Sequence, residues 1–86
     1  MKLKKGFILR EVAGDIIVVP SGDLLDLNMM ISLNETAAFL WKRLELGATE
    51  QELVEALLEE YEASKQEAEL YVKKFEETLN ENGFLE

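Results

Sequence analysis

The feature that most constrains the fold is the segment 28–41, which reads NMMISLNETAAFLW. It passes from a short apolar run that favours a strand directly into a helical pattern, with Asn34 at the junction. Asparagine is a favoured helix N-cap, and Glu35 follows in the first turn, where the helix dipole stabilises a negative charge. Because no loop residues intervene, a strand and a helix are expected to meet end to end here.

The residues before Asn34 predict three short strands. Segments 7–12 and 15–20 are rich in β-branched and aromatic side chains, and a turn at Ala13-Gly14-Asp15 separates them. Pro20 has no amide hydrogen to donate, so the second strand should end or bulge there. After a loop at 21–23, the third strand is expected within residues 25–33. Such short connections predict an antiparallel meander with the first and third strands at its edges.

The residues from Asn34 onward predict three helices. The first carries one apolar stripe and ends at Gly47, while Phe39 lies on the opposite side, so this helix should bury two faces. Capping boxes open the second helix at 49–52 and the third at 64–67. Gly83 should end the third helix, after which Phe84 and Leu85 fold back onto the core. The residues expected to face inward are Ala37, Leu40, Trp41 and Leu44; Leu53, Val54, Leu57, Leu58 and Tyr61; and Ala68, Val72, Phe75 and Leu79.

The order βββααα predicts one α+β domain over residues 1–86, a three-stranded antiparallel sheet followed by three helices. A small sheet beside three helices, with a tight turn between the last two, resembles a winged helix-turn-helix arrangement.

Composition argues against an enzyme. The chain has no cysteine and no histidine, so it lacks the commonest general base and the commonest metal ligands. Paired glutamates are plentiful but fall opposite the apolar stripes, where water keeps them ionised. No phosphate-binding glycine motif occurs. We therefore expect no catalytic residue, no metal site and no cofactor.

The net charge of −9 is confined to one part of the chain. Residues 1–49 carry six acidic and six basic side chains, whereas residues 50–86 carry twelve glutamates and three lysines. This charge would repel a nucleic acid. No apolar run is long enough to span a membrane, and the N-terminus lacks the apolar core of a signal peptide. We expect a soluble, acidic, cytoplasmic protein that binds neither nucleic acid nor membrane.

Two features are less easily explained by packing. Segment 16–19 (IIVV) and most of 27–33 are apolar on both faces, although a half-exposed sheet should alternate apolar with polar residues. Leu70 points away from the apolar stripe of the third helix and stands near Lys74. These features suggest that an extended peptide adds to the edge of the third strand, with Met29 and Met30 as adaptable contacts. The alternatives are that the methionines fill the core and that Leu70 is an ordinary exposed leucine.

The motif LxLN..I.LNETxAFLW, followed by a glycine, a T-x-x-E/Q-L helix start, an EEY end and a final NGFL, resembles the PqqD-like family. The matching residues are 25–28, Ile31, 33–41, Gly47, 49–53, 59–61 and 82–85. The resemblance covers nearly the whole chain.

The resemblance implies a non-catalytic recognition element for ribosomally synthesised, post-translationally modified peptides. Such an element binds the leader of a precursor peptide as a further strand and presents it to a modifying enzyme, often a radical-SAM protein. Carried over by position, the peptide-binding residues would be Asn28, Met29, Met30, Ile31, Ser32, Leu70, Tyr71, Lys74 and Thr78. The alternatives are a winged-helix nucleic-acid-binding or transcriptional module and a structural module that forms a homodimer.

Overall fold

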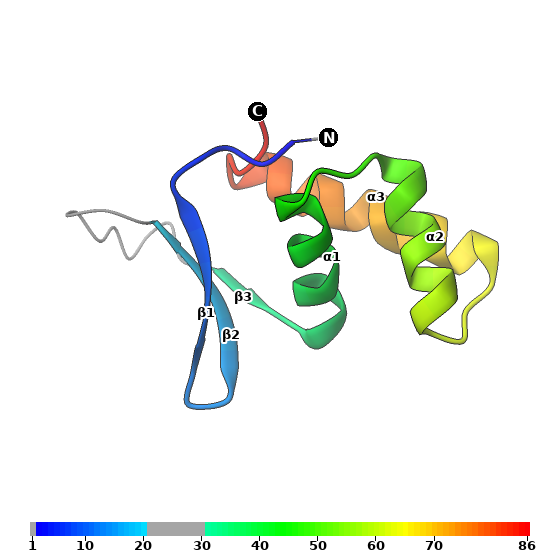
Figure 1. Ribbon diagram of the computed structural model, residues 1–86, viewed down its shortest axis with the longest axis horizontal. Coiled ribbons are helices and arrows are strands. Elements are labelled where there is room, and N and C mark those ends of the chain that lie inside the picture. The colour runs from blue at the N-terminus through cyan, green and yellow to red at the C-terminus, as the bar shows by residue number, and fades with distance from the viewer. Residues whose placement is uncertain (1, 21–30) are drawn as a thin grey trace.

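In the computed structural model, which describes residues 2–20 and 31–86, three strands precede three helices (Figure 1). The strands are β1 (Phe7–Val12), β2 (Asp15–Pro20) and β3 (Ile31–Leu33), and the helices are α1 (Glu35–Glu45), α2 (Glu50–Glu60) and α3 (Lys65–Glu81). The predicted α+β order is confirmed, and β1 and β2 occupy the predicted residues.

The strands form one antiparallel sheet in the order β1-β2-β3, as the short turns predicted. β1 pairs with β2 from Phe7 opposite Pro20 to Val12 opposite Asp15. β2 pairs with β3 from Ile16 opposite Leu33 to Val18 opposite Ile31. β2 ends at Pro20, and the remaining part of the interval expected for the third strand, residues 25–30, lies outside the described residues.

A two-residue turn joins β1 to β2. Its residues, Ala13 and Gly14, have φ angles of 52° and 87°. Positive φ at both central positions is the signature of a type I′ turn, whose twist matches the twist of the strands it joins. Ala13 adopts this conformation at a steric cost that glycine or asparagine would largely avoid.

The strand-to-helix junction has the geometry that its sequence predicts. Asn34 is extended, and its Oδ1 accepts a hydrogen bond of 2.8 Å from the backbone N–H of Ala37. The helix α1 then buries five residues, the four of the predicted stripe together with Ala38. Gly47, with φ of 86°, follows the helix and donates its N–H to the Leu44 carbonyl over 2.9 Å.

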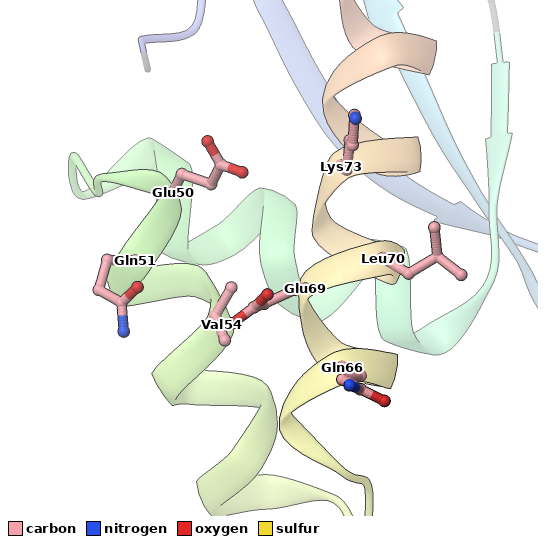
Figure 2. Close-up of a pocket in the computed structure, with 7 residues that line it drawn as sticks. All are labelled: Glu50, Gln51, Val54, Gln66, Glu69, Leu70 and Lys73. Carbon is pink, nitrogen blue, oxygen red and sulfur yellow. The ribbon is translucent and has the colours of Figure 1, made fainter.

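Helices α2 and α3 lie side by side (Figure 1, Figure 2). Both predicted capping boxes are present. Thr49 and Glu52 exchange hydrogen bonds of 3.0 and 3.1 Å, and Ser64 and Glu67 exchange two of 3.1 Å. Each box satisfies two backbone amides that a helix start otherwise leaves unpaired.

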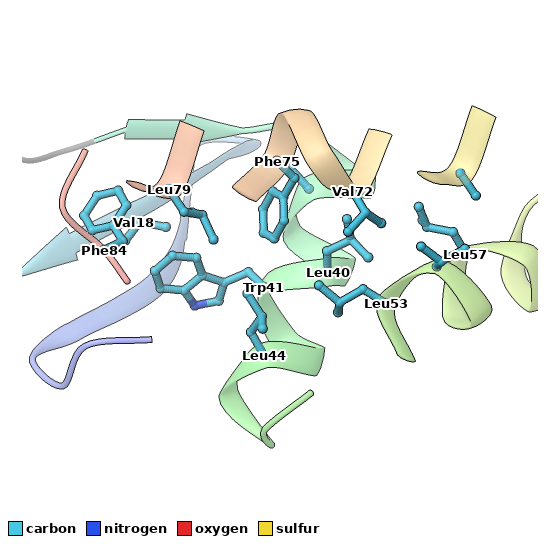
Figure 3. Close-up of a cluster of buried hydrophobic side chains, with 13 residues drawn as sticks. Val18, Leu40, Trp41, Leu44, Leu53, Leu57, Val72, Phe75, Leu79 and Phe84 are labelled. Atoms are coloured by element: carbon cyan, nitrogen blue, oxygen red, sulfur yellow. The ribbon is translucent and has the colours of Figure 1, made fainter. Parts of the chain in front are cut away.

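The core lies where the sheet and the three helices meet, and Trp41 and Phe84 are its largest fully buried side chains (Figure 3). The Phe84 ring packs edge-on against Trp41 and Phe7, with ring centroids 5.7 and 4.6 Å apart. The N-terminal segment holds this C-terminal turn in place, because Lys4 N–H donates to the Phe84 carbonyl over 2.8 Å. The prediction that Phe84 and Leu85 fold back onto the core is confirmed.

Two residues expected to face inward on α2 do not. Leu58 is 37% exposed and Tyr61 is 38% exposed. Leu58 lies at the edge of the apolar stripe of α2. The centre of that stripe, Leu53 and Leu57, belongs to the buried core cluster that residues of α1 and α3 also form. Tyr61 is the C-cap, and its extended backbone takes the side chain off the helix, where it packs edge-on against the half-buried Phe39 at 5.8 Å.

Candidate functional site

A groove of about 250 Å³ lies between β3 and α3. Its most deeply buried lining residues are apolar: Ala37, Phe75 and Leu79 are each less than a tenth exposed. Polar groups surround them on both elements. The lining residues are Ser32, Leu33, Asn34, Ala37, Tyr71, Lys74, Phe75, Thr78 and Leu79. An apolar floor with a few polar groups around it is typical of a binding surface.

One wall of the groove is a sheet edge. Within the part of the chain that the structure describes, β3 pairs with β2 and with no other strand. An edge strand presents backbone N–H and C=O groups that have no partner within the sheet. The groove therefore combines unpaired backbone groups with an apolar floor, and this combination can accept an extended peptide.

A hydrogen bond fixes the position of α3 against the strand-to-helix junction. The hydroxyl of Tyr71 donates to Asn34 Oδ1 over 3.0 Å. The same oxygen accepts the N–H of Ala37, so one side-chain atom both caps α1 and holds α3. This residue pair lies in the groove lining and helps to set the distance between its walls.

The other wall of the groove carries Lys74 and Thr78. The Thr78 hydroxyl donates to the Lys74 carbonyl over 3.0 Å, so its proton is engaged with the helix backbone while its oxygen can still accept. Lys74 is the only charged residue among the described residues that line the groove. Among the described residues it forms no ion pair, whereas Lys65 on the same helix pairs with Glu69 at 3.9 Å.

Four of the residues predicted to bind a peptide come together in this groove: Ser32, Tyr71, Lys74 and Thr78. Ile31 instead packs against the core cluster. Asn28, Met29 and Met30 lie outside the described residues.

Sequence reasoning missed five residues of the lining, which it had assigned to capping and packing alone. The available signal was helical spacing, because Phe75 and Leu79 each stand four residues after another groove residue of α3. The missed residues are Leu33, Asn34, Ala37, Phe75 and Leu79.

Leu70 lines a different hollow, between α2 and α3, with a volume of about 670 Å³. It is 55% exposed, and in Figure 2 its side chain points away from α2. The hollow contains charges of both signs, with Glu50, Glu69 and Lys73 around the buried Val54. Leu70 lies one helical turn before Lys74, but it does not line the groove between β3 and α3.

The electrostatics of α3 near this hollow differ from those of its N-terminus. Partial burial is the largest cause that raises the pKa of Glu76, and repulsion from Glu50 adds to it. The positive charge of the N-terminus lowers this pKa by a smaller amount. At the start of α3 the hydrogen bonds from the Ser64 backbone and side chain lower the pKa of Glu67.

Across residues 2–20 and 31–86 no three acidic side chains converge as metal ligands would. Among the same residues, none of the helices is long and apolar enough to cross a membrane.

Comparisons with known proteins identify the family and the fold. The family model described as "Coenzyme PQQ synthesis protein D (PqqD)" matches residues 16–85. A solved structure titled "TbiB1 in Complex with the TbiA(beta) Leader Peptide" superimposes with a TM-score of 0.81 at 21% identity, over 100% of this chain and 95% of that one. A second, "Lasso peptide synthetase B1 complexed with the leader peptide", gives 0.74 at 25% identity, over 96% and 93%. No curated protein matches the chain in sequence.

Proposed function

The chain belongs to the coenzyme PQQ synthesis protein D family, and from this premise we propose that it is a non-catalytic adaptor for a ribosomally made precursor peptide. It binds the leader segment of that precursor. The observation that carries the proposal is the groove between α3 and the edge of β3 that has no strand partner among the described residues. Two solved structures with this fold are complexes with leader peptides, which supports this use of the fold.

The peptide binds by strand addition. Its backbone pairs with the edge of β3, and its inward side chains lie on Ala37, Phe75 and Leu79. The groove extends along α3 from Tyr71 to Leu79, which is about 12 Å at the rise of a helix. An extended chain covers this distance with about four residues. Met29, Met30 and Asn28 would extend the binding edge, and Leu70 would contact the peptide where it leaves the groove.

The chemistry belongs to a second protein in this proposal. The chain contains neither histidine nor cysteine, and the described residues of the groove lining include no carboxylate to act as a general acid or base. We propose that a radical-SAM enzyme modifies the presented precursor. Because precursor peptides are made by ribosomes, the proposal places the adaptor in the cytoplasm.

The alternative of nucleic-acid binding has little support from α3. A recognition helix normally carries lysine and arginine toward phosphate. Here Lys65, Lys73 and Lys74 stand among five glutamates on the same helix. Self-association through the sheet remains a separate proposal, and concentration-dependent mass in solution tests it.

Titration of isotope-labelled protein with the leader of a precursor encoded beside its own gene tests the proposal. The amides of Ile31–Leu33 and of α3 from Tyr71 to Leu79 should shift, while those of β1 should not. Shifts confined to other surfaces would contradict strand addition at β3. A matched leader with proline at alternate positions is the control, because it cannot donate to the strand edge and should bind weakly.

A further inference from the structure

We infer that the groove is selective for a peptide that places a carboxylate side chain against Lys74. This inference rests on the proposed function and specifies the chemistry of its ligand: an extended segment with apolar side chains toward the floor and one aspartate or glutamate at the α3 wall. The observation that points to it is the charge of the groove, which is opposite in sign to that of the chain.

The groove is unusual for this chain because its described lining residues include no carboxylate. The chain has 18 acidic and 9 basic residues, and residues 50–86 are its most acidic part. The four other hollows described on the surface each include at least one glutamate in their lining. Among residues 2–20 and 31–86, the groove between β3 and α3 includes no glutamate or aspartate, and Lys74 is the one charged residue of its lining.

The helical neighbours of Lys74 leave its ammonium group available. The positions four residues before and after it are Leu70 and Thr78, and neither can form an ion pair. The one acidic side chain at helical spacing is Glu77, three residues later, and among the described residues Lys74 forms no ion pair within 4.0 Å. A lysine without an internal partner in a peptide-binding groove can attract a carboxylate of the ligand.

Lys73 provides an internal comparison. It precedes Lys74 in the sequence but lines the hollow between α2 and α3, where Figure 2 shows it on the same helix as Glu69. Glu69 stands four residues before Lys73, and Glu76 and Glu77 stand three and four residues after it. Among the described residues Lys73 also forms no ion pair within 4.0 Å, but helical spacing surrounds it with three acidic neighbours, whereas Lys74 has one.

The net charge of −9 does not cancel the local attraction. At physiological salt, exposed charges separated by more than about 8 Å are largely screened from each other. A carboxylate in contact with Lys74 therefore interacts mainly with that ammonium group. For a partly exposed pair, the expected preference for glutamate over glutamine is about two- to fivefold in Kd.

A display library of random extended peptides, selected on the full chain and on Lys74→Gln in parallel, tests the inference. Peptides selected on the unchanged chain should be enriched in aspartate or glutamate at one position, which lies at a constant spacing from the apolar residues of the peptide. For one selected peptide, synthetic versions with glutamate, glutamine or lysine at that position are then titrated against the unchanged chain, Lys74→Gln and Lys73→Gln. Amide shifts of Ile31–Leu33 report that the peptide occupies the groove.

The unchanged chain and Lys73→Gln should both prefer the glutamate peptide, and Lys74→Gln should bind the glutamate and glutamine peptides equally. Equal binding of those two peptides by the unchanged chain would overturn the inference and leave peptide binding intact. A preference lost equally in Lys73→Gln would also overturn it, because the general field of α3 would then be responsible. If no selected peptide shifted the β3 amides, the proposed function and the inference would fail together.

Discussion

The hydroxyl of Tyr71 on α3 donates a hydrogen bond of 3.0 Å to Oδ1 of Asn34, the residue that caps α1. These residues are 37 positions apart in sequence. Their contact joins the end of β3, the start of α1 and the middle of α3 at one atom. The groove between β3 and α3 is therefore held at its Asn34 end by the residue that also ends the strand.

We predict that Asn34→Ala lowers the free energy of unfolding by about 1–2 kcal/mol, since it removes the cap of α1 and the partner of Tyr71. Tyr71→Phe removes only the second contact, which is exposed, and should cost about 0.5 kcal/mol. Urea denaturation measures both. Asn34→Ser is the control, because serine still caps the helix. If Asn34→Ala cost no more than Tyr71→Phe, the capping bond would not contribute to stability.

The turn between β1 and β2 offers a stabilising change. Ala13 has a φ of 52°, a conformation that costs an alanine about 1 kcal/mol and that asparagine adopts more readily. Ala13→Asn creates the Asn-Gly pair favoured in type I′ turns, so the free energy of unfolding should rise by about 0.5–1 kcal/mol. Thermal denaturation followed by circular dichroism measures it. Ala13→Val, with a β-branched side chain at the same position, should instead destabilise the protein.

The C-terminal turn contributes more to stability than its position suggests. Phe84 is fully buried between Trp41 and Phe7, and Phe84→Ala should cost about 3–5 kcal/mol. That loss is a large part of the total stability of a small domain. Glu86→Ala is the matched control two residues away. It removes only an exposed ion pair with Lys2 at 3.8 Å and should change the stability by less than about 0.5 kcal/mol.

Two glutamates of α3 should affect the pH dependence of stability in opposite directions. The pKa of Glu67 is lowered by its hydrogen bonds to Ser64, so its charge stabilises the fold above the unfolded-state pKa, and this contribution is lost as pH falls through the folded-state pKa. The pKa of Glu76 is raised by burial and by Glu50, so its protonated form stabilises the fold at low pH, and this contribution is lost as pH rises through the raised folded-state pKa.

Glu67→Gln should therefore be less stable than the unchanged chain at neutral pH, and Glu76→Gln should be more stable there. Both differences should vanish in strong acid, where all three proteins are neutral at these positions. Urea denaturation across the acidic range measures them. Glutamine can keep the capping box of Ser64, so the effect of Glu67→Gln isolates the charge. A gain for Glu76→Gln that persisted in acid would indicate a packing effect instead.

The helices could be predicted from the sequence nearly to their ends because local chemistry determines them. Asn34, Thr49 and Ser64 each cap a helix through bonds to residues three positions away, and such bonds require no tertiary information. Leu58 was placed wrongly because its exposure depends on how much of α2 the other helices cover. Periodicity indicates the direction of a side chain but not the extent of its neighbours.

The groove could be predicted only in part for a similar reason. Ser32, Tyr71, Lys74 and Thr78 were expected from the resemblance to the PqqD-like family, by their positions on the third strand and the third helix. Ala37, Phe75 and Leu79 were assigned to the core, and each of them is indeed buried. A buried residue that also forms the floor of a groove cannot be distinguished from an ordinary core residue until β3 and α3 are placed relative to each other.

Filling the groove gives a direct prediction for function. Thr78 is exposed on the α3 wall, and its hydroxyl makes only the bond to its own helix, so a large side chain there should not disturb folding. Thr78→Trp should occupy part of the space of about 250 Å³ and weaken binding of any peptide that the unchanged chain holds at β3, by roughly tenfold or more. Calorimetric titration measures the affinity, and urea denaturation should show similar stability.

The matched control for this change is Asn80→Trp. Asn80 is also exposed, neutral and on α3, but it does not line the groove. A tryptophan there adds the same apolar surface outside the proposed site, so the affinity should stay within about twofold of the unchanged chain. If Asn80→Trp weakened binding as much as Thr78→Trp did, the loss would come from a general effect on α3. Equal affinity of Thr78→Trp and the unchanged chain would instead place the peptide on a surface other than the groove between β3 and α3.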